Sequence, residues 1–428
     1  MKIAITTVGT RGDLQPYIAL GLGLKNSGYE VLIVSAKNEE SFVRNYGLDF
    51  YALDVNIQKI MEGGDVQEMA KGSNPVKFII SHLKGSKSLK ALMVKTQGEI
   101  WNACKNTDLI IFHPGMPLGF FLAKDKNKKV ILATPFPVVA TKDYPSILFY
   151  ALPKLGSYYN LITHFIFDKV FWALAKSPIK EFWENSIKTR ANFHFSPLQQ
   201  QIKSGGLVFN GYSKLLFSHS KQWPNNIHTT GSWIIETAAN FLPPKELDDF
   251  INNGEMPIYI GFGSMKDLSS FDKTIAVIID TLQRTKQRAV VGLGWTKNNY
   301  KGKLPSNIFL VESVPHTWLF PRMKMVIHHG GAGTTATGLR AGKPTIIIPH
   351  NADQPALGQK VFELGVGSKP IKKSKLSADN LSKAILYCMT PVIIENAEQL
   401  GQKLKSENGV QKAVEIIDRF ISEENGSS

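Results

Sequence analysis

The residues most suited to bind a ligand or take part in a reaction lie between positions 328 and 354, where a glycine-rich turn follows a short apolar run. The run, 325–327, has the composition of a buried parallel strand. The turn and its flanks supply His329, Gly331, Gly333 and Thr334. Glycines let a backbone approach a ligand closely, and the start of a helix presents unpaired N–H groups and a partial positive charge. The pattern predicts a diphosphate site, to which His329 can add a hydrogen bond.

The helix after this turn is expected to be capped by Thr334 and Thr335. A second buried strand, 345–349, ends just before Asp353 and Gln354. In an open α/β sheet both groups would lie at the carboxyl ends of neighbouring strands, where ligands bind. An acid and an amide there can hold several sugar hydroxyls. The alternative, a tight glycine turn without a ligand, leaves the adjacent histidine, threonines and acid–amide pair unexplained.

The amino-terminal end of the chain carries a second glycine-rich loop. A strand at 2–8 precedes it, an apolar helix is expected from Tyr17 to about Asn26, and a strand at 31–35 completes a βαβ unit. The loop contains one carboxylate, Asp13. A helix N-terminus holds such a group as the anion, which is the form that accepts a proton. Asp13 can equally be a helix N-cap and nothing more.

Two other strand exits carry polar residues. His113 follows the predicted strand 108–112 and can orient Asp13 or share a proton with it, although a histidine at a strand end is more often structural. Gly263 and Ser264 follow the first strand of a second domain and can donate an N–H and a hydroxyl to a phosphate. Ser264 can also simply cap the next helix.

Aromatic residues crowd the segment 144–190, which indicates either a buried helix pair or the wall of a large apolar pocket. Five of them are candidate contacts for a hydrophobic acceptor: Tyr144, Phe149, Tyr159, Phe171 and Trp172. An earlier segment, 71–105, contains seven lysines and one acid. Its apolar residues follow a helical pattern, so it is either a membrane-facing helix or a surface helix with a solvated lysine face.

At 428 residues and 43% apolar composition, the chain is expected to form two domains. The predicted boundaries are an N-terminal domain at 1–236, a linker at 237–256, a C-terminal domain at 257–402, and a helix with a frayed tail at 403–428 that returns to the first domain. No signal peptide and no membrane-spanning run is expected. The two cysteines, Cys104 and Cys388, match no metal spacing, which fits a reducing cytoplasm.

The formal net charge of +15 calls for an explanation. No nucleic-acid motif is present and the lysines are spread along the chain, so nucleic acid is not expected as a partner. A peripheral contact with an anionic membrane surface is one interpretation, and plain solubility is the other.

The stretch 328–354 resembles the donor-binding motif of nucleotide-sugar glycosyltransferases with the GT-B fold, most closely the sterol 3-beta-glucosyltransferase group. The run 9–16, Gly-Thr-Arg-Gly-Asp-Leu-Gln-Pro, is similar to the amino-terminal signature of that group. The resemblance implies an α/β protein with two Rossmann-like domains, whose parallel sheets face a central cleft. It also implies that Asp13 is the general base that deprotonates the acceptor hydroxyl.

For the donor, the resemblance implies diphosphate contacts from the turn at 329–334 and sugar contacts from Asp353 and Gln354. The other donor contacts that we expect are Gly9, Thr10, Arg11, Gly263, Ser264 and Val314. Plant members of the family have a stacking tryptophan where this chain has Ser313, so backbone groups at Val314 are expected to hold the uracil. The aromatic segment 144–190 resembles the acceptor domain of the sterol enzymes, which implies a sterol-like acceptor.

The expected reaction is therefore an inverting transfer of glucose from UDP-glucose to a hydroxyl of a sterol or related lipid, without a metal or a prosthetic group. One alternative is a natural-product glycosyltransferase that uses a UDP- or dTDP-sugar on a macrolide, flavonoid or glycopeptide. Another is a membrane-associated protein that binds nucleotide sugars without turnover. A third is an epimerase of the same fold, which would release free sugar or nucleotide without an acceptor.

Overall fold

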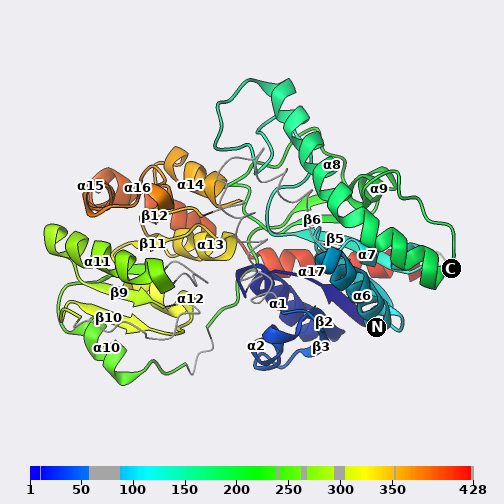
Figure 1. Ribbon diagram of the computed structural model, residues 1–428, viewed down its shortest axis with the longest axis horizontal. Helices are drawn as coiled ribbons and strands as arrows, with labels where there is room; N and C mark the ends of the chain where they lie inside the picture. Colours follow the sequence, from blue (N-terminus) through cyan, green and yellow to red (C-terminus); the bar gives the residue numbers. More distant parts are fainter. Residues whose placement is uncertain are drawn as a thin grey trace. The chain divides into compact units, whose positions relative to one another are not determined.

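The computed structural model describes residues 1–9, 11–56, 87–237, 241–261, 268–293, 304–350 and 353–425. The chain forms two compact units: unit 1 is Met1–Ile234 with Asn408–Ser428, and unit 2 is Ile235–Glu407. Each unit is built on its own parallel sheet (Figure 1). This confirms the expected α/β class with two parallel sheets. Thr10, Gly263 and Ser264 lie outside the described residues, as does the part of the lysine-rich segment that precedes α6, residues 71–86.

Within the described residues, the sheet of unit 1 has the order β3-β2-β1-β4-β5-β6-β7, and every pairing is parallel. Its strands are β1 (Lys2–Thr6), β2 (Glu30–Ala36), β3 (Asp49–Leu53), β4 (Leu109–Phe112), β5 (Lys129–Thr134), β6 (Val208–Asn210) and β7 (Ile227–Thr229). The central strand β1 is covered on both faces, which is why Ile3, Ala4 and Ile5 form a continuous buried apolar run. The strand order reverses between β1 and β4, so the loops that leave these two strands lie at a switch point where ligands bind.

Helix α1 (Arg11–Asn26) begins at Arg11, so the expected start at Tyr17 is wrong. Gly12 and Pro16 are poor helix formers, and they made the sequence look like a loop. In the folded chain Leu14 and Tyr17 are buried, and this packing outweighs the low local propensity.

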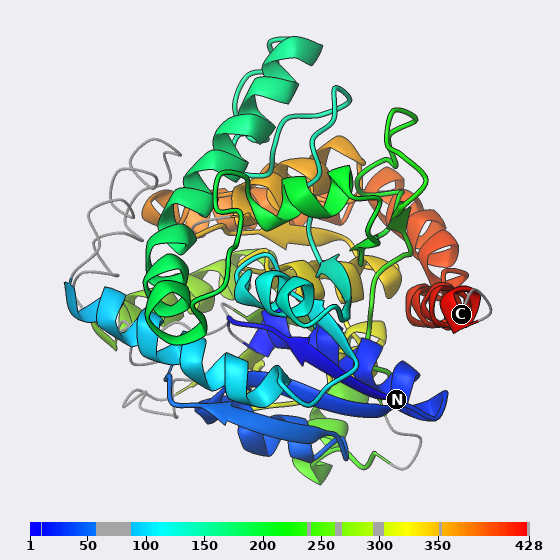
Figure 2. The same cartoon turned by 90° about the vertical axis from the view of Figure 1, so that its right-hand side faces the viewer.

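The other helices of unit 1 surround this sheet (Figures 1 and 2). They are η1 (Lys37–Glu39), α2 (Glu40–Arg44), α6 (Lys87–Cys104), α7 (Leu118–Asp125), α8 (Ser157–Phe182), a π-helical turn (Trp183–Ile187), α9 (Pro197–Lys203) and α17 (Gly409–Asn425). Helix α6 packs against α7 and α8, and α17 packs against α1. The hydroxyl of Tyr29 donates to Asp418 at 2.7 Å. The carboxyl-terminal helix is thus part of unit 1.

Within the described residues, the sheet of unit 2 has the order β10-β9-β8-β11-β12, again with parallel pairings throughout. Its strands are β8 (Ile258–Gly261), β9 (Ala289–Gly292), β10 (Ile308–Val311), β11 (Val326–His328) and β12 (Thr345–Ile347). The reversal of strand order between β8 and β11 again creates a switch point. The glycine turn predicted to bind a diphosphate leaves β11 at this position.

The helices of unit 2 are α10 (Lys245–Asn252), α11 (Leu268–Thr285), α12 (His316–Leu319), η3 (Phe320–Arg322), α13 (Ala332–Arg340), α14 (Gln354–Glu363), η4 (Lys373–Lys375), α15 (Ala378–Cys388) and α16 (Pro391–Lys405). Helix α10 lies in the segment that the sequence indicated as a linker. Its Leu247 and Ile251 are buried in a core cluster with Val290 and Phe320. None of the described helices combines the length and the apolar character needed to cross a membrane.

Candidate active site

The exit of β11 leads directly into the amino-terminal end of α13. Gly330 turns the chain with φ of +97°, Gly331 stands at the N-cap, and Gly333 and Thr334 lie in the first turn. Among the described residues no side chain caps this helix, so the expected capping by Thr334 and Thr335 is wrong. The hydroxyl of Thr335 instead donates to the carbonyl of Gly331 (2.8 Å), as threonines inside helices often do. The N–H groups of the first turn are therefore not occupied by a cap, and they suit an anion.

Gly330 brings the glycine turn after β11 into contact with the start of α14. A methyl group on Gly330 would lie 2.7 Å from Cγ2 of Ile347 and 3.2 Å from both Cβ and O of Gln354, so only glycine fits. Gln354 is the first residue of α14, and Asp353 is its N-cap residue. Oε1 of Gln354 accepts a hydrogen bond from the backbone N–H of His350 at 2.8 Å. Gln354 therefore also braces the loop between β12 and α14.

His329 lies at the mouth of the turn. Its Nε2 would be 2.7 Å from a methyl group on Gly331, so the ring sits against the helix end. Burial lowers the pKa of His329 to about 4, and a hydrogen bond with the backbone of Gly261 offsets part of this shift. Nδ1 is buried and has no hydrogen-bond partner among the described residues. At pH 7 the imidazole is therefore neutral.

Two further histidines at the same edge of the sheet were not singled out by the sequence analysis. His316 follows β10 and stacks on Phe320 with ring centroids 4.4 Å apart, and His350 follows β12 with its ring 6.2 Å from that of His329. Burial lowers the pKa of His316 to about 4, and His329 adds to this shift. Burial, then Lys373 and His329, lower the pKa of His350 to about 3. Their positions just after predicted strands were the signal that could have found them.

Val314 lies in the connection between β10 and α12. It is partly buried against a core cluster that includes Val311 and Leu319. The side chain therefore takes part in packing, and the backbone groups are the part of this residue that can serve a ligand.

In unit 1, Asp13 lies in the first turn of α1 and not at its N-cap. Its carboxylate lies against Gly9, because a methyl group on Gly9 would be 2.4 Å from Oδ2. The buried Tyr17 is one turn further along the helix, and its hydroxyl donates to the carbonyl of Ala133 at 2.7 Å. Burial and then the charge of Asp13 raise the pKa of Tyr17 well above its usual value. Arg11 opens the same helix.

His113 follows β4, the strand next to β1. Its ring packs edge-on against Tyr17, with centroids 5.7 Å apart. Nδ1 accepts a hydrogen bond from the backbone N–H of Gly115 at 2.9 Å. Burial lowers the pKa of His113 to about 4, so at pH 7 the ring is neutral and carries its proton on Nε2. Nε2 is buried without a hydrogen-bond partner among the described residues, so it can donate to a ligand.

Two of the five aromatic residues expected to contact an acceptor are buried in the core of unit 1. Tyr144 packs against Phe217 with centroids 5.6 Å apart. Trp172 is 6% exposed, stacks on Phe121 and donates from Nε1 to the carbonyl of Phe193 at 3.2 Å. Their burial fits the alternative in which this segment supplies core residues.

The other three aromatic residues are at least partly accessible. Phe171 is 39% exposed and stacks on Phe167 with centroids 4.3 Å apart. Phe149 and Tyr159 are partly buried. The five residues therefore have different surroundings.

Among the described residues, no group of three or more His, Cys, Asp or Glu side chains is arranged to hold a metal ion.

Two family models match the chain, one in unit 1 and one mostly in unit 2. The glycosyltransferase family 28 N-terminal domain matches residues 3–106, which include Asp13. The erythromycin biosynthesis protein CIII-like C-terminal domain matches residues 267–420, which include His329 and Gln354.

Curated relatives match nearly the whole chain. A sterol 3-beta-glucosyltransferase of Arabidopsis thaliana is 32% identical over 442 residues, which cover 99% of this chain and 69% of that protein. A sterol 3-beta-glucosyltransferase of Sclerotinia sclerotiorum is 31% identical over 434 residues, which cover 98% of this chain and 29% of that protein. The chain thus spans only part of the length of these relatives.

Solved structures resemble the chain along its full length. The glycotransferase of kitacinnamycin has a TM-score of 0.67 at 17% identity and covers 98% of each chain. The glycosyltransferase SnogD from Streptomyces nogalater has a TM-score of 0.65 at 17% identity and covers 98% of this chain and 99% of its own. VinC, a glycosyltransferase solved in complex with dTDP, has a TM-score of 0.64 at 16% identity. These similarities confirm the GT-B fold.

Proposed function

The chain belongs to the glycosyltransferase family that includes the sterol 3-beta-glucosyltransferases, and on this basis we propose the reaction that it catalyses. Glucose passes from UDP-glucose to a hydroxyl group of a sterol or related lipid alcohol, with inversion at the anomeric carbon. The single observation that best supports a nucleotide-sugar donor is the uncapped start of α13, which follows a switch point in the sheet of unit 2.

The diphosphate would bind at this helix start. The N–H groups after Gly331 and the helix dipole favour a dianionic leaving group without a buried cation. The neutral ring of His329 carries one proton, so donation from Nδ1 to a phosphate oxygen would take this proton from the hydrogen bond with the backbone of Gly261. A neutral imidazole suits this role, because it adds a hydrogen bond while burial disfavours the charged form. Gly263 and Ser264 remain predicted donors, and they lie outside the described residues.

The sugar would lie next to this site, at the start of α14. Asp353 can accept hydrogen bonds from sugar hydroxyls, and Gln354 can present its amide while it braces the loop at His350. Because Gly330 packs against Gln354, the spacing between the phosphate and sugar subsites is set by one close contact. Backbone groups at Val314 would bind the uracil, and Gly9, Thr10 and Arg11 would complete the donor contacts.

The acceptor hydroxyl would bind in unit 1, next to Asp13 and His113. Asp13 would take the hydroxyl proton as the acceptor oxygen attacks the anomeric carbon. The bond from that carbon to the diphosphate oxygen breaks, and its electron pair leaves with UDP. Nε2–H of His113 can hold the acceptor oxygen by a hydrogen bond and leave the proton transfer to the carboxylate. Tyr159, Phe149 and Phe171 are the accessible aromatic candidates for contact with the lipid.

The test is a transfer assay with purified protein and UDP-glucose against a panel of sterols, flavonoids and macrolides. We expect a mass gain of one hexose on a sterol, together with a β-glycosidic product by NMR. Parallel reactions with dTDP-glucose should be slower. UDP release without an acceptor would indicate an epimerase or a hydrolase, and UDP binding without a hexose gain on any acceptor would refute glucosyl transfer.

A further inference from the structure

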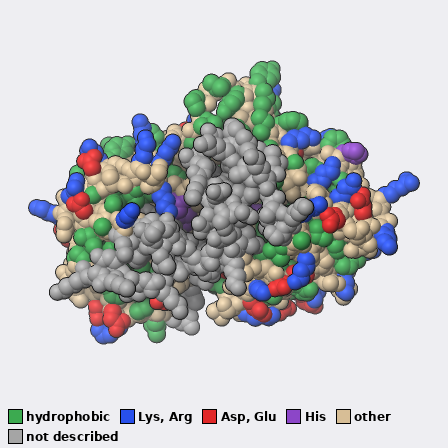
Figure 3. Space-filling model, viewed as in Figure 1, with side chains coloured by type: hydrophobic (Ala, Val, Ile, Leu, Met, Phe, Trp, Pro, Cys, Tyr) green, Lys and Arg blue, Asp and Glu red, His purple; other side chains and the backbone are tan. Residues whose placement is uncertain are grey.

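The amino-terminal end of α8 presents large apolar side chains to solvent. Tyr158, Ile162 and Phe165 are 76%, 56% and 57% exposed, and Leu155, just before the helix, is 70% exposed. The three helical residues are spaced four and three positions apart, so they form one stripe along the helix. In Figures 1 and 2 this end of α8 extends beyond the sheet of unit 1. Figure 3 shows hydrophobic side chains gathered there.

The opposite side of the same helix supplies the packing that holds α8 in unit 1. Thr163, His164 and Phe167 are buried. Oγ1 of Thr163 accepts from the backbone N–H of Ser146 at 2.8 Å, and Nε2 of His164 lies 3.0 Å from the carbonyl of Tyr144. The fold therefore uses one side of the helix, through hydrogen bonds and the buried Phe167, and the exposed apolar stripe lies on the other side. An exposed cluster of large apolar residues marks an interaction surface.

Lysine side chains border the exposed stripe. Nζ of Lys142 lies 5.5 Å from the ring centroid of Tyr158, and Nζ of Lys169 lies 5.4 Å from that of Phe165. Nζ of Lys154 lies 5.4 Å from the ring of the nearby Tyr150. Lys154 and Lys169 are exposed and Lys142 is half-buried. The aliphatic stem of a lysine can cover apolar surface while its charged end faces water. One exposed acid, Asp143, adjoins Lys142 in the chain.

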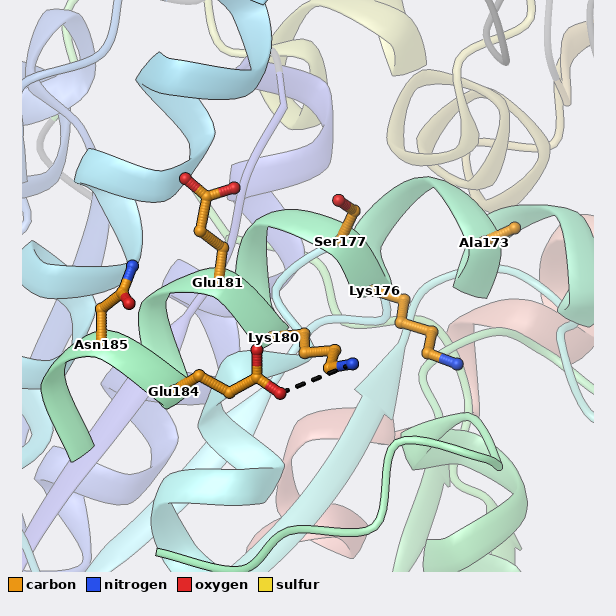
Figure 4. A pocket seen from close by; sticks show the side chains of 7 residues that line it. All are labelled: Ala173, Lys176, Ser177, Lys180, Glu181, Glu184 and Asn185. Carbon is orange, nitrogen blue, oxygen red and sulfur yellow. Dashed lines mark ion pairs between the residues drawn. The ribbon is translucent and has the colours of Figure 1, made fainter. Parts of the chain in front are cut away.

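The remainder of α8 has a different surface, which limits the stripe to the amino-terminal half. A shallow pocket there, of about 400 Å³, is lined by Ala173, Lys176, Ser177, Lys180, Glu181, Glu184 and Asn185 (Figure 4). Lys180 pairs with Glu184 at 3.5 Å, and Glu181 pairs with Lys90 of α6 at 2.9 Å. Polar and paired side chains thus replace the apolar ones along this part of the helix.

We propose that the α8 tip docks on the surface of an anionic lipid bilayer. The α8 tip comprises Leu155, Tyr158, Ile162 and Phe165 with the bordering Lys142, Lys154 and Lys169. Aliphatic and aromatic side chains enter the boundary between headgroups and acyl chains, and lysines beside them contact lipid phosphates. The net charge of +15 adds a long-range attraction to the same surface. The α8 tip contains none of the residues proposed to contact the acceptor. An acceptor dissolved in the membrane would nevertheless give membrane docking a function.

Vesicle co-sedimentation of the full chain tests this proposal. Phosphatidylcholine vesicles with about 30 mol% phosphatidylglycerol should bind the protein at least about tenfold more tightly than pure phosphatidylcholine vesicles, and salt should weaken the binding. The double variant Ile162→Glu/Phe165→Glu should reduce binding by at least about tenfold. The matched control is Leu386→Glu, because Leu386 is also a helical residue, on α15 of unit 2, and is also 56% exposed.

The proposal holds if only the α8 variant loses vesicle binding while both variants keep the wild-type melting temperature. It fails if the wild-type protein does not bind anionic vesicles, or if Leu386→Glu reduces vesicle binding more than the α8 variant does. It also fails if the tip mediates self-association that lipid does not change. A sterol delivered by cyclodextrin, without vesicles, tests the proposed reaction separately from membrane docking. The α8 variant should glucosylate that acceptor at the wild-type rate. If neither the variant nor the wild-type protein glucosylates it, the proposed acceptor is refuted, and the docking proposal is then decided by the vesicle result alone.

Discussion

The carboxylate of Asp13 rests against Gly9, so closely that a methyl group on Gly9 would lie 2.4 Å from Oδ2. Gly9 has φ of +138°, a conformation that other residues rarely adopt. A loop residue just after β1 therefore fixes the position of a carboxylate in the first turn of α1. This contact links the position of the proposed base to the glycine at position 9.

Replacing Asp13 with asparagine should lower the rate of glucosyl transfer by about 10²–10⁴-fold, because the shape is kept while the proton acceptor is lost. Affinity for UDP, measured by calorimetry, should change by less than about threefold, since the diphosphate is proposed to bind in unit 2. Asp49→Asn, at an exposed position in β3, is the control and should keep the wild-type rate. Normal turnover by Asp13→Asn would remove this residue from the mechanism.

Gly9→Ala should separate the effect of the carboxylate position from backbone strain. Gly28 also has positive φ, +89°, but a methyl group there would meet nothing within 4 Å. Both alanine variants should lower the free energy of unfolding by about 1–3 kcal/mol. Only Gly9→Ala should also lower kcat, by at least about tenfold, because it displaces Asp13. Equal kcat values for the two variants would show that the contact has no part in catalysis.

A second pair of glycines tests the donor half of the site. Gly330→Ala would collide with Ile347 and Gln354 and should weaken UDP binding by at least about tenfold, with a loss of about 1–3 kcal/mol in stability. Gly338 lies inside α13, where a methyl group would make only ordinary contacts of 3.6 Å or more. Gly338→Ala should therefore stabilise the protein by about 0.5–1 kcal/mol and leave UDP affinity unchanged. Similar UDP affinities for both variants would contradict the site.

Acid should destabilise this protein through its buried histidines. Burial lowers the pKa of four of them from 6.5 to about 4: His113, His164, His316 and His329. Between about pH 6.5 and pH 4 the unfolded chain binds protons at these positions that the folded chain does not. The free energy of unfolding should therefore be fully retained above about pH 6.5 and fall as the pH drops toward 4, by up to about 1.4 kcal/mol per pH unit for each histidine.

Urea unfolding followed by tryptophan fluorescence at several pH values measures this slope. His164→Gln should make the slope shallower by the contribution of one site. His194→Gln, at an exposed position, should leave the slope as in the wild-type protein. An unchanged slope in His164→Gln would show that this histidine is not kept neutral by burial.

The strand–turn–helix arrangement that carries the proposed diphosphate site could be predicted from a short sequence pattern. Glycines that follow an apolar strand favour a turn, and the turn at Gly330–Gly331 does leave β11 and enter α13. The first residues of helices were harder to predict from the sequence, because they depend on burial as well as on local helix propensity. The start of α1 at Arg11, despite Gly12 and Pro16, and the N-cap at Gly331 both went against the local signals.

By itself the sequence determined which residues stand at the ends of buried strands, since an alternation of apolar runs with glycine and polar residues is a local property of the chain. The tertiary structure decided which strands are neighbours, and so which of these ends meet. The placement of β11 between β8 and β12 brings His329 to the backbone of Gly261, and Gly330 to Gln354. It also decided that Trp172 is core while Phe165 on the same helix is exposed, because burial depends on contacts between segments distant in the chain.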